Sequence, residues 1–195
     1  FYIPFSFYGV TSPSISTVPF TLRIHPTGRR GFALPLTSSF HFCPRNPNPT
    51  EDLLRSVAQI NAIDSIDFVL VTGDITEEGD RATMLKVKET LDLLKAKYYV
   101  ILGNHETKWS DSGCTAFGEI FGGERFEFEH KGILFLGFNS GPLMRMAYGH
   151  VVPQDIRWMT EEMDKFGKDK PVILVTHYPL LDGDVDNWYE VTDAV

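Results

Sequence analysis

The sequence predicts an α/β domain whose strands are covered on both faces and end in polar residues. Short apolar runs alternate with amphipathic stretches of helical length, a pattern typical of α/β folds. The runs within 66–74, 98–102 and 171–179 are nearly continuously apolar, which is typical of strands buried on both faces. Polar, ligand-capable side chains stand at the end of each of these runs.

Composition divides the chain near residue 50. Residues 1–50 contain no Asp, Glu or Lys and carry a formal charge of +4, whereas the remainder carries −12. Eight of the 12 prolines also lie in the first 50 residues. We therefore expect residues 1–31 to be an acid-free leader, a disordered arm or a non-native segment, and residues 32–195 to form the domain. The acid-poor lead weakly indicates a periplasmic or secreted protein, with the cytoplasm as the alternative.

The composition also excludes several classes of protein. A net charge of −8 disfavours binding to the phosphate backbone of nucleic acids. No apolar run approaches the roughly 18 residues that a transmembrane helix needs. Two cysteines cannot build a disulfide framework or a cysteine metal site. The sequence carries no signal of an oligomeric state.

The elements of the first half follow in order from residue 31. The segment 31–38 resembles a strand, although Pro35 disfavours a central position in a sheet. Thr50, followed by two acidic residues, predicts a helix start, because a hydroxyl can cap the first turn and acids complement the helix dipole. A strand within 66–74 and a long helix over roughly 80–97 come next.

The second half begins with the strand 98–102 and a short helix at 115–122. The segment 125–139 predicts a hairpin that turns at Lys131 and Gly132. Residues 153–166 predict a helix with proline near its start. A buried strand within 171–179 follows, and residues 186–195 suggest one more helix.

The strand ends predict a functional edge. Ligands of open α/β sheets bind beyond the carboxyl ends of the strands. Asp74, Asn104, His105 and His177 all stand at such ends, so we expect them to converge. Carboxylate, amide and imidazole donors suit Mn²⁺, Fe or Zn²⁺. Two such ions about 3.5–4 Å apart can activate water for a phosphoryl displacement.

Three motifs resemble the calcineurin-like metallophosphoesterase family. They are Gly-Asp at 73–74, Gly-Asn-His-Glu at 103–106 and Thr-His-Tyr-Pro at 176–179, in that order and each after an apolar strand. The resemblance covers about residues 32–195. It implies a four-layer β-sandwich flanked by helices and truncated at its C-terminus, with two divalent metal ions at one edge. The activity it implies is hydrolysis of phosphoric esters, either monoesters or diesters.

The resemblance also implies roles for individual residues. Asp74 would bridge the two metals, and Asn104 and His177 would bind the second. His105 would act on the phosphate as general acid or electrostatic stabiliser. Glu106 would orient His105 from behind.

Two departures from the family pattern leave a second function open. The family begins with Asp-x-His, and here the matching segment is Ser39 to His41, so that His41 fits the metal ligand while serine stands in place of aspartate. The later Gly-His-x-His motif is not found in these 195 residues. The alternative is therefore a non-catalytic binding module, or an inactive fragment, whose first metal site is incomplete.

Overall fold

The computed structural model describes residues 18–22, 32–37, 48–142, 148–167 and 169–180. These residues form a mixed α/β structure. Its elements are β1 (Val18–Leu22), β2 (Phe32–Thr37), α1 (Pro49–Asn61), β3 (Phe68–Val71), α2 (Arg81–Leu91), β4 (Lys97–Val100), α3 (Asn104–Lys108), α4 (Thr115–Phe121), β5 (Phe126–His130), β6 (Ile133–Gly137), α5 (Pro153–Phe166) and β7 (Val172–Val175).

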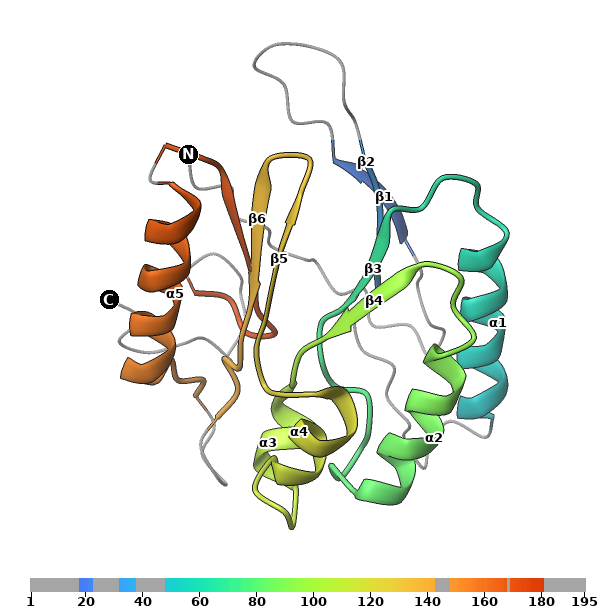
Figure 1. Ribbon diagram of the computed structural model, residues 1–195. Coiled ribbons are helices and arrows are strands. Elements are labelled where there is room, and N and C mark those ends of the chain that lie inside the picture. The colour runs from blue at the N-terminus through green and yellow to red at the C-terminus, as the bar shows by residue number, and fades with distance from the viewer. Residues whose placement is uncertain (1–17, 23–31, 38–47, 143–147, 168, 181–195) are drawn as a thin grey trace.

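Two sheets lie face to face with helices outside them, which confirms the predicted layered fold (Figure 1). One sheet has the strand order β1-β2-β3-β4, and the other has the order β5-β6-β7. Helices α1 and α2 pack on the outer face of the first sheet, and α5 packs on the outer face of the second (Figure 1). The helix–sheet–sheet–helix stack accounts for the absence of polar alternation in the central strands.

Successive side chains of each central strand point into two different apolar cores. Phe68 and Leu70 of β3 point into the core between the two sheets, whereas Val69 points into the core under α1 and α2. In β6, Phe135 belongs to the core between the sheets, and Leu136 belongs to the core under α5. Strands β3 and β6 therefore bury both faces, and burial of this apolar surface is the main stabilising contribution to the fold.

Strand direction places the functional edge. Strands β3 and β4 run parallel, with Val71 opposite Val100. Strands β6 and β7 are also parallel, with Gly137 opposite Val175. The segments that follow β3 and β4 therefore leave the first sheet at the same end.

The predicted long helix over 80–97 is wrong at its C-terminal end. Helix α2 stops at Leu91, and Lys97 is already the first residue of β4. Residues 97–100 gain ladder hydrogen bonds to β3, and the Tyr98 hydroxyl donates to the Asp92 carboxylate at 2.6 Å. Strand pairing overrides the helical pattern of the local sequence here.

Strand β2 contains Pro35 and still pairs with a strand on each side. This strand lies between β1 and β3, although Pro35 disfavours such a place. Its pairing with β3 is confined to Leu36 and Thr37, beyond the proline that cannot donate a hydrogen bond. Strand β1, which pairs with β2, lies inside the segment 1–31 that composition sets apart.

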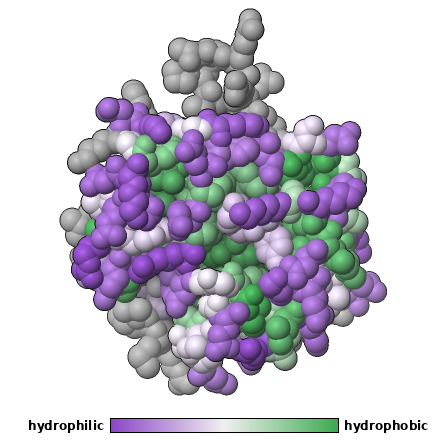
Figure 2. Space-filling view, viewed as in Figure 1, coloured by the Kyte–Doolittle hydropathy of each residue, from purple (hydrophilic) through white to green (hydrophobic). Residues whose placement is uncertain are grey.

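The surface shown in Figure 2 is predominantly hydrophilic, with apolar residues lying between the polar ones. Exposed apolar residues of this kind are ordinary for a globular protein. None of the described helices combines the length and the apolarity that crossing a membrane would require. The predicted helix 186–195 lies outside the described residues.

Candidate active site

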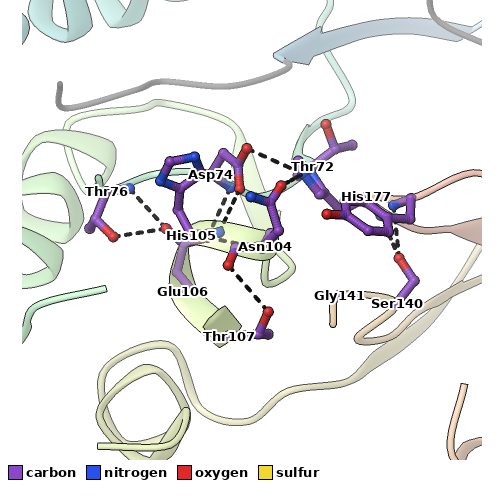
Figure 3. A network of polar contacts seen from close by, with 12 residues as sticks. Thr72, Asp74, Thr76, Asn104, His105, Glu106, Thr107, Ser140, Gly141 and His177 are labelled. Carbon is purple, nitrogen blue, oxygen red and sulfur yellow. Dashed lines mark hydrogen bonds and ion pairs between the residues drawn. The ribbon is translucent and has the colours of Figure 1, made fainter. Parts of the chain in front are cut away.

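Three predicted site residues meet where strands of both sheets end (Figure 3). Asp74 lies in the loop after β3, Asn104 begins α3 after β4, and His177 follows β7. The His177 Nε2 atom lies 3.2 Å from Asp74 Oδ2 and 3.0 Å from Asn104 Oδ1. Residues far apart in the sequence thus present a carboxylate, an amide oxygen and an imidazole nitrogen to one point.

Two glycines allow the loops after β3 and β4 to approach each other. A Cβ atom on Gly103 would lie 2.1 Å from Asp74 Oδ1, and one on Gly73 would lie 2.5 Å from the Gly103 nitrogen. Gly73 also has a φ of +92°. A side chain at either position would therefore push Asp74 and Asn104 apart.

The tautomer of His177 follows from its backbone partner. Its Nδ1 atom lies 2.7 Å from the carbonyl oxygen of Thr72, and a carbonyl oxygen can only accept a hydrogen bond. Nδ1 therefore carries a proton. In the neutral ring, the lone pair of Nε2 then faces the oxygens of Asp74 and Asn104. Three electron-rich atoms converge, which is the arrangement that a bound cation stabilises.

The pKa shifts of His177 and Asp74 both favour a positive charge next to the Asp74 carboxylate. Burial is the largest influence on the pKa of His177 and lowers it, but the Asp74 charge and the hydrogen bonds to Asp74 and Thr72 together raise that pKa. Burial is also the largest influence on the pKa of Asp74 and raises it. Attraction to the protonated His177 ring, the hydrogen bond from that ring and the one from the His105 backbone together bring the net pKa below its usual value.

His105 contributes both its backbone and its ring. Its backbone N–H donates to Asp74 Oδ1 at 3.1 Å. Its ring Nδ1 lies 2.6 Å from the carbonyl oxygen of Glu77, so Nδ1 again carries a proton. His105 also lines a cavity of about 840 Å³ that extends to Trp109 and the start of α4.

Glu106 contacts other groups than the resemblance implies. The side chain is fully buried, and it accepts hydrogen bonds at 2.9 Å from the backbone N–H groups of Asp74, Gly103 and Thr76 and from the Thr76 hydroxyl. The carbonyl of Glu77, and not the carboxylate of Glu106, accepts the ring proton of His105. The predicted role of Glu106 behind His105 is replaced by a link between two loops (Figure 3).

Ser140 is a site residue that sequence reasoning missed. The residue is fully buried, and its Oγ atom accepts the backbone N–H groups of His177 at 3.1 Å and Tyr178 at 2.9 Å. Ser140 thereby holds in place the backbone segment that carries the His177 ring. Ser140 also follows an apolar strand, β6, so the signal that singled out the other strand ends could have found it.

The donor set determines what cation this site could hold. Within the described ranges, no group of three or more His, Cys, Asp or Glu side chains is placed to bind a metal ion. Asp74 and His177 supply two such side chains, and the amide of Asn104 supplies a third donor. Oxygen and imidazole donors in this combination fit a divalent cation such as Mn²⁺, Fe²⁺ or Zn²⁺. Ser39 and His41 lie outside the described residues.

Comparisons with known proteins place the chain among phosphoesterases. A family model described as "Calcineurin-like phosphoesterase" matches residues 24–194. A protein of Arcobacter nitrofigilis named "Probable glycerophosphodiester phosphodiesterase" is 31% identical over 121 residues, which cover 58% of this chain and 42% of that protein.

Two further relatives are more distant. An uncharacterized protein of Bacillus subtilis is 28% identical over 133 residues, covering 60% of this chain and 10% of that protein. A 3′,5′-cyclic-nucleotide phosphodiesterase of Nostoc is 23% identical over 133 residues, covering 68% of this chain and 48% of that protein. The chain spans less than half the length of each of these curated relatives.

Proposed function

The chain belongs to the calcineurin-like phosphoesterase family, and from this premise we propose that it hydrolyses phosphodiesters with the help of divalent metal ions. The observation that carries the proposal is the convergence of Asp74, Asn104 and His177 on one point. The names of two relatives, both phosphodiesterases, support the choice of substrate class.

Residues of this chain would hold the metal and align the phosphate. We assign Asp74, Asn104 and His177 to the metal site, with His41 completing a second position of a two-metal centre. Mn²⁺, Fe and Zn²⁺ fit these donors. When bound, such ions supply an activated water and neutralise charge on the phosphoryl group.

His105 would move the proton. Its Nδ1 is held by the carbonyl of Glu77, so proton exchange with a substrate is left to Nε2. In the imidazolium form, Nε2–H would donate to the leaving alkoxide oxygen. The hydrogen bond from the His105 backbone N–H to Asp74 Oδ1 keeps His105, the proposed proton donor, next to Asp74, the proposed metal ligand. General acid catalysis of this kind contributes about 10²–10⁴-fold in rate.

The charge around His105 favours diesters over monoesters. Five acidic residues line the adjoining cavity, and the one arginine in its lining, Arg81, is paired with Glu119. A phosphomonoester carries close to two negative charges at neutral pH, whereas a diester carries one. Carboxylates near the substrate therefore repel the monoester more strongly.

The test compares a diester with a monoester that share one leaving group. The metal-free protein would be assayed with bis(p-nitrophenyl) phosphate and p-nitrophenyl phosphate, before and after Mn²⁺ is added. We expect hydrolysis only with Mn²⁺ and a higher kcat/KM for the diester. A protein that binds Mn²⁺ yet cleaves neither ester would instead be the non-catalytic binding module. Asn104→Ala should lose both Mn²⁺ binding and hydrolysis.

A further inference from the structure

We infer that Glu106 is a positioning residue that acts on Asp74 and not on His105. The carboxylate of Glu106 holds the backbone of Asp74 so that the Asp74 side chain points at His177. The inference deepens the proposed function, since Asp74 is a proposed metal ligand there. It also corrects the assignment that motif resemblance alone would give to Glu106.

Glu106 is a buried carboxyl group whose oxygens are satisfied by hydrogen bonds alone. Burial, and then the nearby Asp74 charge, raise its pKa, and the hydrogen bonds from Gly103 and Thr76 oppose that shift. The side chain has no exposed surface. Among the described residues, no lysine or arginine forms an ion pair with it. Its compensation comes from four hydrogen-bond donors, two for each oxygen. Because an ionised carboxylate offers about four acceptor positions, these donors use its whole capacity.

Those four donors belong to two different loops. Oε2 accepts the N–H groups of Asp74 and Gly103, and so joins the loop after β3 to the end of β4. Oε1 accepts the N–H and hydroxyl groups of Thr76. The Thr76 oxygen in turn accepts the N–H of Gly79 at 2.9 Å. One buried side chain thus organises the loop from Asp74 to Gly79.

Asp74 needs this support because its backbone is unfavourable. Its φ is +52°, in the left-handed region that a non-glycine residue rarely adopts. The Glu106 carboxylate holds the Asp74 N–H, and the His105 N–H holds Asp74 Oδ1. With both its backbone and its carboxylate held, Asp74 keeps Oδ2 directed at His177.

The decisive variant is Glu106→Gln, which keeps the shape of the side chain. One carboxylate oxygen becomes an NH₂ group, which cannot accept a hydrogen bond. Either the Thr76 N–H or the N–H groups of Asp74 and Gly103 therefore lose their acceptor. Asp155→Asn is the matched control, since Asp155 is also a buried carboxylate but pairs with Arg125 beside α5. Near-ultraviolet circular dichroism would establish that both variants are folded.

Metal binding gives the first readout. Titration calorimetry with Mn²⁺ should show affinity weakened about 10–100-fold in Glu106→Gln, the range for loss of a group that orients a metal ligand. Asp155→Asn should bind as the wild type does. At saturating Mn²⁺, kcat of Glu106→Gln should return to within about threefold of the wild-type value, in line with a role in positioning the ligand. Unchanged affinity, or a kcat deficit that Mn²⁺ does not restore, would overturn the inference.

A metal-free readout separates this inference from the proposed function. At fixed pH, the imidazole ¹⁵N shifts of His177 should change more in Glu106→Gln than those of His105, whose ring contacts the Glu77 carbonyl and not the Glu106 carboxylate. The reverse pattern would assign Glu106 to His105. If the wild-type protein binds no Mn²⁺, the proposed function fails, and these shifts still decide the role of Glu106.

A second pair of variants covers the case in which Glu106→Gln does not fold. Thr76→Val removes the hydroxyl that donates to Glu106 and accepts from Gly79, whereas Thr76→Ser retains it. We expect the His177 shifts to move in Thr76→Val and to be restored in Thr76→Ser. Equal spectra for the two variants would contradict the link from Glu106 to Asp74.

Discussion

The two histidines of the site come from different regions of the molecule and are held in the same way. His105 lies in α3, after the four-stranded sheet, and His177 follows β7 of the three-stranded sheet. In each ring, Nδ1 donates to a backbone carbonyl, that of Glu77 at 2.6 Å for His105 and that of Thr72 at 2.7 Å for His177. Both rings therefore carry the Nδ1 proton and are held in the same orientation relative to the backbone carbonyl.

The difference between the two rings lies in what surrounds them. His177 Nε2 faces the oxygens of Asp74 and Asn104, whereas His105 lines an open cavity. The same ring held in the same tautomer is thus suited to bind a cation in one place and to exchange a proton with a substrate in the other. Environment, and not residue type, separates the two proposed roles.

The largest expected effect comes from removing the proposed proton donor. His105→Ala should lower kcat about 10²–10⁴-fold, because the leaving oxygen loses its general acid. Metal content measured by elemental analysis should stay at the wild-type value. If His105→Ala instead empties a metal site, or if added Mn²⁺ restores its rate, the two histidines do not differ in role.

Removing the other histidine should give the opposite pattern. His177→Ala leaves Asp74 and Asn104 without their imidazole partner, so we expect Mn²⁺ affinity to fall by about 10–100-fold or more. Activity should decline with metal occupancy and recover in part at high Mn²⁺. A variant that keeps its metal but loses turnover would place His177 among the proton-transfer groups.

A smaller effect should follow when the support of His177 is removed. Ser140→Ala leaves the buried N–H groups of His177 and Tyr178 without their acceptor, which costs about 1–3 kcal/mol of unfolding free energy. Urea denaturation measures this loss, and Mn²⁺ affinity should weaken with it. Thr160→Ala is the control, because the exposed Thr160 hydroxyl bonds only within α5. Equal stability for the two variants would mean that Ser140 does not position His177.

The smallest effect concerns the cavity beside His105. Glu78→Gln neutralises one exposed carboxylate of its lining. Because salt screens exposed charges, we expect kcat/KM for a phosphomonoester to rise only about two- to fivefold at low ionic strength, and the gain to vanish near 0.5 M salt. Mn²⁺ affinity, which depends on the His177 side of the site, should not change. If kcat/KM for the phosphomonoester is the same in Glu78→Gln and in the wild type, the charge of the cavity does not explain a preference for diesters.

The sequence by itself determined most of the elements and the edge at which they place polar groups. The hairpin turns at Lys131 and Gly132, both at positive φ, as the paired apolar runs predicted. Helix α5 spans Pro153–Phe166, the predicted range. Periodicity and turn residues are local signals, and strand ends in parallel sheets share an edge, so the sequence is enough to group Asp74, Asn104 and His177. The division at residue 31 and the role of His41 stay predictions.

Tertiary structure alone decided which atoms hold these residues. The carbonyls of Thr72 and Glu77, which fix the two imidazole rings, belong to the backbone, and residue type does not reveal them. Glu106 stands beside His105 in sequence, yet its carboxylate reaches the loop of Asp74. The end of α2 was likewise decided by pairing of β4 with β3. The reason is physical: a buried polar group must bond to whatever the packed layers bring within reach, and that partner is chosen in space and not along the chain.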